Sequence, residues 1–312
     1  MVIALVTAVV VLYTLQSFFT KLYSNEYSSD KELATPVFTV ISGLVIAAVS
    51  FIVFGGCKFD FNPWSVVIGC ANAFALYGYN YFIVKCSRTG PYSIFIIFSK
   101  AGAILLPIAF SLMLGWDSWN SAFDVVLNTV SIAVVIAAVY FTSVKPAAEN
   151  EGAQSEKITF GFILSCIGLA VSNGAYAILV NTQQMVEVAG GGNNADEMII
   201  VTYVAASVLS FAVIAFKKKG IVKAFSMNKS AALYAVAVGG VTGFAINFLA
   251  MTVLLVSTTI FYTLYNSLTL IFSILLGCIA FKEKLTKVNV IGVILMCAAI
   301  TMMNLLPALI NG

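Results

Sequence analysis

One positively charged side chain, Lys100, lies within an apolar run of the sequence, whereas no acidic residue lies near the middle of any such run. It lies nine residues into the run 91–114, which is roughly 13 Å along a helix of roughly 36 Å. An ammonium at this depth in a bilayer costs at least about 2.5 kcal/mol, so it is expected to face a polar interior. A fixed positive charge without an internal carboxylate favours a ligand that is itself anionic or zwitterionic. The alternative is a structural lysine that snorkels to an interface or donates to the carbonyls of a broken helix.

Amide and hydroxyl side chains recur at helical spacing in other apolar runs. Residues three or four apart share one face of a helix, and one run carries a whole stripe of them: Thr259, Tyr262, Thr263, Asn266, Thr269 and Ser273. The candidate substrate-binding residues are Lys100, Gln16, Tyr77, Asn80, Asn173, Tyr176, Asn247, Tyr262 and Asn266. For the amides, the alternative is interhelical hydrogen bonding worth about 0.6 kcal/mol apiece, and both interpretations stay open.

The sequence lacks the residues that several kinds of chemistry require. The chain has no histidine, so neither a Ser-His or Cys-His nucleophile pair nor a His-Glu-x-x-His metal site can be built. Its six cysteines form no Cys-x-x-Cys pair. An exchange mechanism that uses a carboxylate in mid-membrane has no such group here, and the amide of Gln16 cannot replace it. We therefore expect no enzyme activity, no cofactor and no metal, with a polytopic membrane enzyme or a non-transporting membrane scaffold as the competing alternatives.

These side chains must be positioned by membrane helices. The sequence is 61% hydrophobic and 9% charged, against roughly a quarter charged in globular proteins. Apolar runs long enough to cross about 30 Å of hydrocarbon predict ten spans, at 2–21, 36–56, 63–84, 91–114, 123–143, 158–182, 198–216, 231–253, 256–281 and 288–309. The predicted fold class is an all-α membrane protein, because a lipid-exposed segment must satisfy its own backbone hydrogen bonds.

A polar linker at 145–157 divides the spans into a first half, 1–144, and a second half, 158–312, with five spans each. An odd number of spans per half predicts two inverted five-helix repeats, an arrangement common in secondary transporters. A single offset lays residues 77–82 on 244–249, which places Asn80 opposite Asn247. Chance similarity between two apolar helices is the alternative explanation of that alignment.

The basic residues predict the orientation. Odd-numbered loops hold fourteen of them, from Lys21 to Lys287, and even-numbered loops hold only Lys58. Cytoplasmic loops carry the excess of Lys and Arg, so both termini are predicted outside the cytoplasm. The first span lacks the features of a cleaved signal peptide, and we expect an integral protein of the cell (inner) membrane.

The sequence Phe281-Lys282-Glu283-Lys284-Leu285-Thr286-Lys287, followed by the glycine-containing run 291–295, resembles the connector before the last helix of the EamA-like branch of the drug/metabolite transporter superfamily. Span number, length and halving are similar over the whole chain, but 115–120 lacks the Glu-Lys motif. The resemblance implies a secondary transporter of a small polar metabolite that works by alternating access. Members move amino acids, sugars, nucleotide sugars, phosphorylated metabolites, nucleobases or drugs; Lys100 favours an amino acid or a phosphorylated metabolite. The expected partners are this solute and the lipid bilayer, with coupling to a proton or another ion left open, and no nucleic acid. Several branches are described with cytosolic termini, whereas the charge distribution of this chain predicts the opposite.

Overall fold

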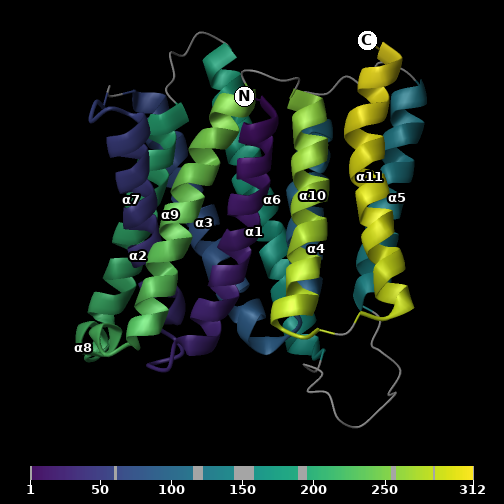
Figure 1. Cartoon of the computed structure of the whole chain (residues 1–312). Coiled ribbons are helices and arrows are strands. Elements are labelled where there is room, and N and C mark those ends of the chain that lie inside the picture. Colours follow the sequence, from purple (N-terminus) through teal and green to yellow (C-terminus); the bar gives the residue numbers. More distant parts are fainter. Residues whose placement is uncertain are drawn as a thin grey trace.

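The computed structural model describes residues 2–59, 62–114, 122–143, 158–188, 195–253, 258–283 and 285–311. These residues form ten long helices, one short helix and a π-helical turn, and contain no strand (Figure 1). The elements are α1 (Val2–Glu26), α2 (Ala34–Val49), η1 (Ser50–Phe54), α3 (Pro63–Thr89), α4 (Tyr92–Leu114), α5 (Ala122–Ser143), α6 (Phe160–Val188), α7 (Ala195–Phe216), α8 (Gly220–Phe225), α9 (Lys229–Val253), α10 (Thr258–Ala280) and α11 (Lys287–Asn311).

Each of the ten predicted apolar runs falls on one long helix, and the helical class is confirmed for the described residues. Six of the helices are long and apolar enough to cross a membrane, namely α1, α2 with η1, α3, α6, α7 and α9. In α4, α5, α10 and α11 the described apolar stretches are shorter, between 10 and 17 residues. The chain therefore has the helices of an integral membrane protein.

Helix α1 continues five residues beyond the predicted end of the first span at residue 21. Lys21, expected in a loop, is consequently inside the helix and only 1% exposed. The extension is stabilised by Tyr23, whose buried hydroxyl donates to the carbonyl of Ala34 at 2.6 Å. A hydropathy pattern ends a span at its first lysine, but tertiary contacts decide where the helix ends.

Two helix starts are explained by local sequence. In α3 the side chain of Asn62 accepts a hydrogen bond from Trp64 N at 2.9 Å, and Pro63 occupies the first helical position, where its missing N–H costs nothing. At α11, Thr286 and Asn289 cap each other reciprocally, each backbone N–H donating to the other side chain at 3.1 Å. Asn289 also donates to the carbonyl of Thr142 at 2.9 Å, which joins the start of α11 to the end of α5.

Glycines allow two of the helix pairs to approach closely. A Cβ on Gly102 of α4 would lie 2.0 Å from the carbonyl oxygen of Ala170 in α6. In α9, a Cβ on Gly239 would lie 2.8 Å from the carbonyl of Ser42 in α2. The next residue, Gly240, faces open space instead. Small residues thus set the α4–α6 and α2–α9 distances.

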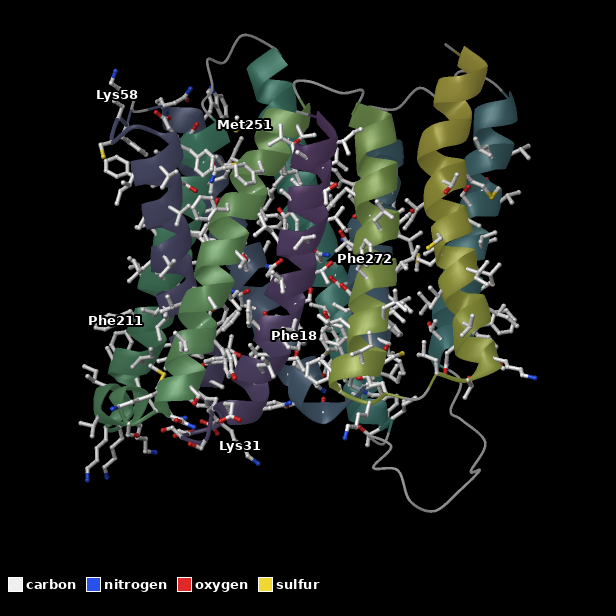
Figure 2. The ribbon with its side chains drawn as sticks, in the orientation of Figure 1. Phe18, Lys31, Lys58, Phe211, Met251 and Phe272 are labelled. Carbon is white, nitrogen blue, oxygen red and sulfur yellow. The ribbon has the colours of Figure 1, made fainter. Side chains whose placement is uncertain are left out.

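The helix pairs in contact are mainly formed between the two halves of the chain. Helix α1 packs on α9 and α10, α3 on α6 and α7, α4 on α6 and α10, α2 on α7 and α9, and α5 on α11. Both ends of the chain lie at the same end of the bundle (Figure 1). This terminal end carries Lys58 and Met251, whereas Lys31 lies at the opposite end, near α8 (Figure 2). We call that opposite end the α8 end.

Candidate functional site

Lys100 lies on α4 and reaches α10 in the other half of the chain. Its Nζ donates to Oδ1 of Asn266 at 3.0 Å and lies 4.6 Å from the ring centroid of Tyr265. The Tyr265 ring in turn packs against Tyr13 of α1, with 5.2 Å between the centroids. An amide oxygen and the negative face of an aromatic ring both favour the charged ammonium. The contact joins α4 with α10 and, through the aromatic pair, with α1.

Asn173 of α6 lies beside this lysine. Its Nδ2 donates to the backbone oxygen of Ser99 at 2.8 Å and to the Ser99 hydroxyl at 3.0 Å. The neighbouring residue Gly174 packs so closely on α4 that a Cβ there would lie 2.6 Å from the carbonyl of Gly102. The close α4–α6 contact therefore brings an amide from α6 to the residue that precedes Lys100.

Three tyrosines extend the polar group away from Ser99. The hydroxyl of Tyr79 on α3 interacts with Ser99 and is close to Tyr176 on α6. Tyr176 interacts in turn with the hydroxyl of Tyr203 on α7. Their rings pack together in one apolar cluster, so only the hydroxyl ends are polar. The arrangement brings α3, α4, α6 and α7 together with donors and acceptors in one interior region.

Asn80 and Asn247, which the sequence alignment pairs, both bind helix α2 and its π-helical extension. Asn80 Nδ2 donates to Oγ1 of Thr39 at 3.1 Å. Asn247 Nδ2 donates to Oγ of Ser50 at 2.9 Å and to the carbonyl of Gly243 at 2.7 Å. Both side chains are buried, and none of these bonds reaches Lys100. Their contacts match interhelical hydrogen bonding, the alternative that the sequence left open.

The structure describes fewer contacts for the remaining candidate residues. Gln16 of α1 and Tyr77 of α3 are half-buried, and Gln16 has no side-chain hydrogen bond within the described residues. Tyr262 belongs to α10, but its side chain lies outside the described part of the chain, as do those of Thr259 and Thr263. Of the six-residue stripe, Asn266 contacts Lys100, and Thr269 and Ser273 are buried.

Tyr13, Tyr79, Tyr203 and Tyr265 were not among the candidates. Tyr265 directly precedes Asn266, and Tyr79 directly precedes Asn80, so each lies about 100° around its helix from the residue that the helical pattern selected. The sequence does not connect Tyr265 with Lys100, because the cation–π contact forms only when α4 packs on α10. Nothing in the sequence connects Tyr203 with Tyr176, because only the α3–α6–α7 packing brings them together.

Charged side chains bind the residues between α3 and α4 at the α8 end of the bundle. The carboxylate of Glu283, after α10, accepts hydrogen bonds from the backbone N–H groups of Tyr92 and Ser93 and from the Ser93 hydroxyl. Lys21 of α1 donates to the carbonyl of Gly90 at 3.0 Å. Residues 90 and 91 connect α3 to α4, and residues 92 and 93 begin α4. An anion therefore holds the start of α4, and a cation holds the residue that follows α3. We call Glu283, Lys21 and residues 90–93 the connector clamp.

Aromatic rings and an arginine fill the space around this clamp. The Phe281 ring lies 5.6 Å from Phe18 and 5.4 Å from Tyr92, and the Lys21 ammonium lies 5.9 Å from the same ring. Arg88 donates to the carbonyls of Ser24 and Tyr27, at 3.0 and 3.2 Å. These contacts join α1, the α3–α4 connector and the segment after α10. Glu283 is part of the motif on which the family resemblance depends, and here it stabilises the N-terminus of another helix.

Comparisons with known proteins identify a shared fold. No family model matches the chain, and no curated protein sequence matches it. Chains of solved structures do match, 26 in all. One of them, described as "Crystal structure of protein", has a TM-score of 0.60 and 14% identity, over 99% of this chain and 98% of that chain. At this level of identity the similarity shows the fold alone.

Proposed function

We propose that the protein is a secondary transporter of the drug/metabolite type, with ten spans in two inverted five-helix halves, and that it moves a small anionic or zwitterionic solute by alternating access. The observation that carries the proposal is the contact between Lys100 and Asn266, at 3.0 Å. It places a positive charge and an amide from opposite halves of the chain in the same interior region. A charge inside a membrane bundle is expensive and is expected to serve a function.

The pattern of helix contacts supports the inverted arrangement. In this arrangement the helices α1, α2, α3, α4 and α5 correspond, in that order, to α6, α7, α9, α10 and α11. When the halves are exchanged, the α1–α9 contact becomes α6–α3, the α4–α6 contact becomes α10–α1, and the α3–α7 contact becomes α9–α2. All six contacts are present. The α2–α7, α4–α10 and α5–α11 contacts are converted into themselves. Two halves related by a pseudo-two-fold axis would produce this set of contacts. The alignment of Asn80 with Asn247 supports it less, because Asn80 bonds to α2 and Asn247 to η1, and both of these elements belong to the first half.

The connector clamp supports the interpretation that the structure is one conformation of a transport cycle. Charged hydrogen bonds and packed rings close the α8 end, where the charge distribution predicts the cytoplasm. In this proposal the structure is closed to the cytoplasm, and inward opening requires release of the α3–α4 connector from Glu283 and Lys21. Charge-assisted hydrogen bonds of about 1.5 to 3 kcal/mol each are weak enough to be exchanged for the binding energy of a solute.

Reconstitution tests the proposal directly. The protein would be incorporated into phospholipid vesicles, and uptake of labelled amino acids, sugars and phosphorylated metabolites would be measured with and without a proton gradient. We expect saturable uptake of at least one anionic or zwitterionic solute, and loss of that uptake in Lys100→Ala. Lys100→Arg should retain binding but transport poorly, because a guanidinium is larger and releases protons far less readily.

Lys58→Ala provides the matched control, since it also removes one lysine but lies at the exposed terminal end (Figure 2). It should transport at the parent rate. Transport by Lys100→Ala at the parent rate would show that Lys100 is structural and would remove the anion-site assignment. A folded parent protein that transports no solute of the panel would favour a membrane scaffold, and turnover of a solute would favour an enzyme.

A further inference from the structure

We propose that the corner between α7 and α8 binds the headgroups of anionic phospholipids. The corner consists of residues 216–223, Phe-Lys-Lys-Lys-Gly-Ile-Val-Lys, and we call it the lysine corner. It lies at the α8 end of the bundle (Figure 1), and the contacts of Lys100 described above involve α10 and not α8. The proposal depends on the chain being embedded in a bilayer and not on its being a transporter.

The lysine corner is a sharp turn that its sequence requires. Lys219 has a left-handed backbone, with φ of 56°. At Gly220, a Cβ would lie 1.9 Å from the carbonyl oxygen of Ile214, so only glycine permits the chain to fold back against the end of α7. Helix α8 therefore starts immediately after the span, at the level where a membrane interface would lie.

Two of the lysines hold this turn in place. Lys217 Nζ lies 3.3 Å from Asp30 and also pairs with Glu32, and Lys223 Nζ lies 2.9 Å from Asp30. Lys223 is the largest of the influences that lower the pKa of Asp30 to about 2. The connector between α1 and α2 therefore binds the corner from one side, and the other side is left for a different partner.

Two further lysines face outward. Lys218 and Lys219 are exposed, and neither forms an ion pair with any acidic residue in the described ranges. In Figure 2, long side chains that end in nitrogen extend below α8. Basic residues at the cytoplasmic end of a span attract anionic lipid, with a free energy that corresponds to about a fivefold gain in binding per lysine.

Exposed apolar side chains lie next to these two lysines, and they favour a lipid over a soluble anion as the ligand. Phe216 is 92% exposed and Val222 is 70% exposed, whereas Ala224 packs inward. One helical turn and a half before Phe216, Phe211 also lies on the outer face of α7 (Figure 2). Exposed apolar groups next to basic groups are the pattern of a segment that inserts rings and methyl groups below the headgroups and keeps its ammonium groups at the phosphates.

The test compares lipids on the purified full-length protein in detergent. Phosphatidylglycerol, phosphatidylcholine or free glycerol phosphate would be added, and the unfolding midpoint and the lipids retained in native mass spectra would be recorded. We expect phosphatidylglycerol alone to raise the midpoint and to remain bound. The K218Q/K219Q variant should bind it about 25-fold more weakly, the product of two fivefold losses.

K282Q/K287Q is the matched control, because it removes the same charge from two exposed lysines of the α10–α11 region at the same end. It should bind phosphatidylglycerol as the parent does. F216S/V222S keeps every lysine and should weaken the binding of phosphatidylglycerol, because it removes the exposed apolar side chains. Equal losses in K218Q/K219Q and K282Q/K287Q, or a response to free glycerol phosphate as large as that to phosphatidylglycerol, would overturn the proposal.

Discussion

Ser93 donates both its backbone N–H and its hydroxyl to one carboxylate oxygen of Glu283, at 3.0 and 2.5 Å, although the two residues are 190 positions apart. The pair joins the start of α4 to the segment after α10. Free N–H groups at a helix N-terminus need an acceptor, and here the acceptor comes from the other half of the chain.

Glu283→Gln should weaken the connector clamp. The amide oxygen replaces a charged acceptor that takes three hydrogen bonds, so the free energy of unfolding should fall by about 1.5 to 3 kcal/mol. Thermal unfolding in detergent would measure the loss. Lys287→Gln, an exposed change nearby, should have no effect.

The same variant should expose two native thiols. Cys86 and Cys166 are buried with their sulfurs 3.8 Å apart, and Cys86 lies one turn before Gly90. In a protein that retains only these two cysteines, Glu283→Gln should speed maleimide labelling if the clamp closes this end. Labelling as slow as in the parent would show that Glu283 stabilises the fold but does not close the α8 end of the bundle.

Lys100 and Asn266 should be energetically coupled. Asn266→Leu removes the amide acceptor of a partly buried ammonium, which should cost about 1 to 3 kcal/mol of stability. In a Lys100→Met background the same change should cost little, because no ammonium is left without its acceptor. A double-mutant cycle on unfolding midpoints measures the difference. Equal costs in the two backgrounds would mean that the contact contributes nothing to stability.

Gly102→Ala should separate α4 from α6. The new methyl group would lie 2.0 Å from the carbonyl of Ala170, a backbone atom that cannot turn away. The expected loss of stability is about 1 to 3 kcal/mol. Gly240→Ala provides the comparison, since that position faces open space and alanine favours a helix. It should leave stability unchanged or raise it, and equal effects at both positions would contradict the close contact.

The Asp30 ion pairs should respond to acid. Lys223, the backbone N–H of Glu32 and Lys217 together hold the pKa of Asp30 near 2, below its ordinary value of 3.8. A lowered folded-state pKa contributes stability that is present above pH 3.8 and is lost as the pH falls through 2. The stability difference between the parent and Asp30→Asn should therefore be constant at neutral pH and shrink toward pH 2. A difference independent of pH would indicate that the carboxylate charge is unimportant.

Reporter fusions test the orientation. A fusion after Gly312 should be active outside the cytoplasm, and one inserted after Asn228, within the basic α8 end, should be active inside. The basic residues at that end and the position of both termini at the opposite end motivate this expectation (Figure 1). A C-terminal fusion active only in the cytoplasm would reverse the orientation and the assignment of the connector clamp to the cytoplasmic side.

The sequence alone determined the helical class and the approximate positions of the ten long helices. These properties depend on hydropathy and on local backbone hydrogen bonding, which a short stretch of sequence carries in full. Asn266 was selected from the sequence as a candidate residue, because a polar stripe at helical spacing indicates the face that points inward.

Only the tertiary structure decided which residues meet. Lys21 looked like a loop lysine but is buried in α1 and bonds to Gly90. Asn80 bonds to α2 and Asn247 to η1, and neither bonds to Lys100. Glu283 was recognised as part of a motif, yet its role in capping α4 depends on a helix far away in the sequence. Such contacts depend on the rotation and the separation of packed helices, and glycines such as Gly102 set the separation. Helical periodicity identifies the face of a helix that points inward, but it does not identify the helix that this face contacts.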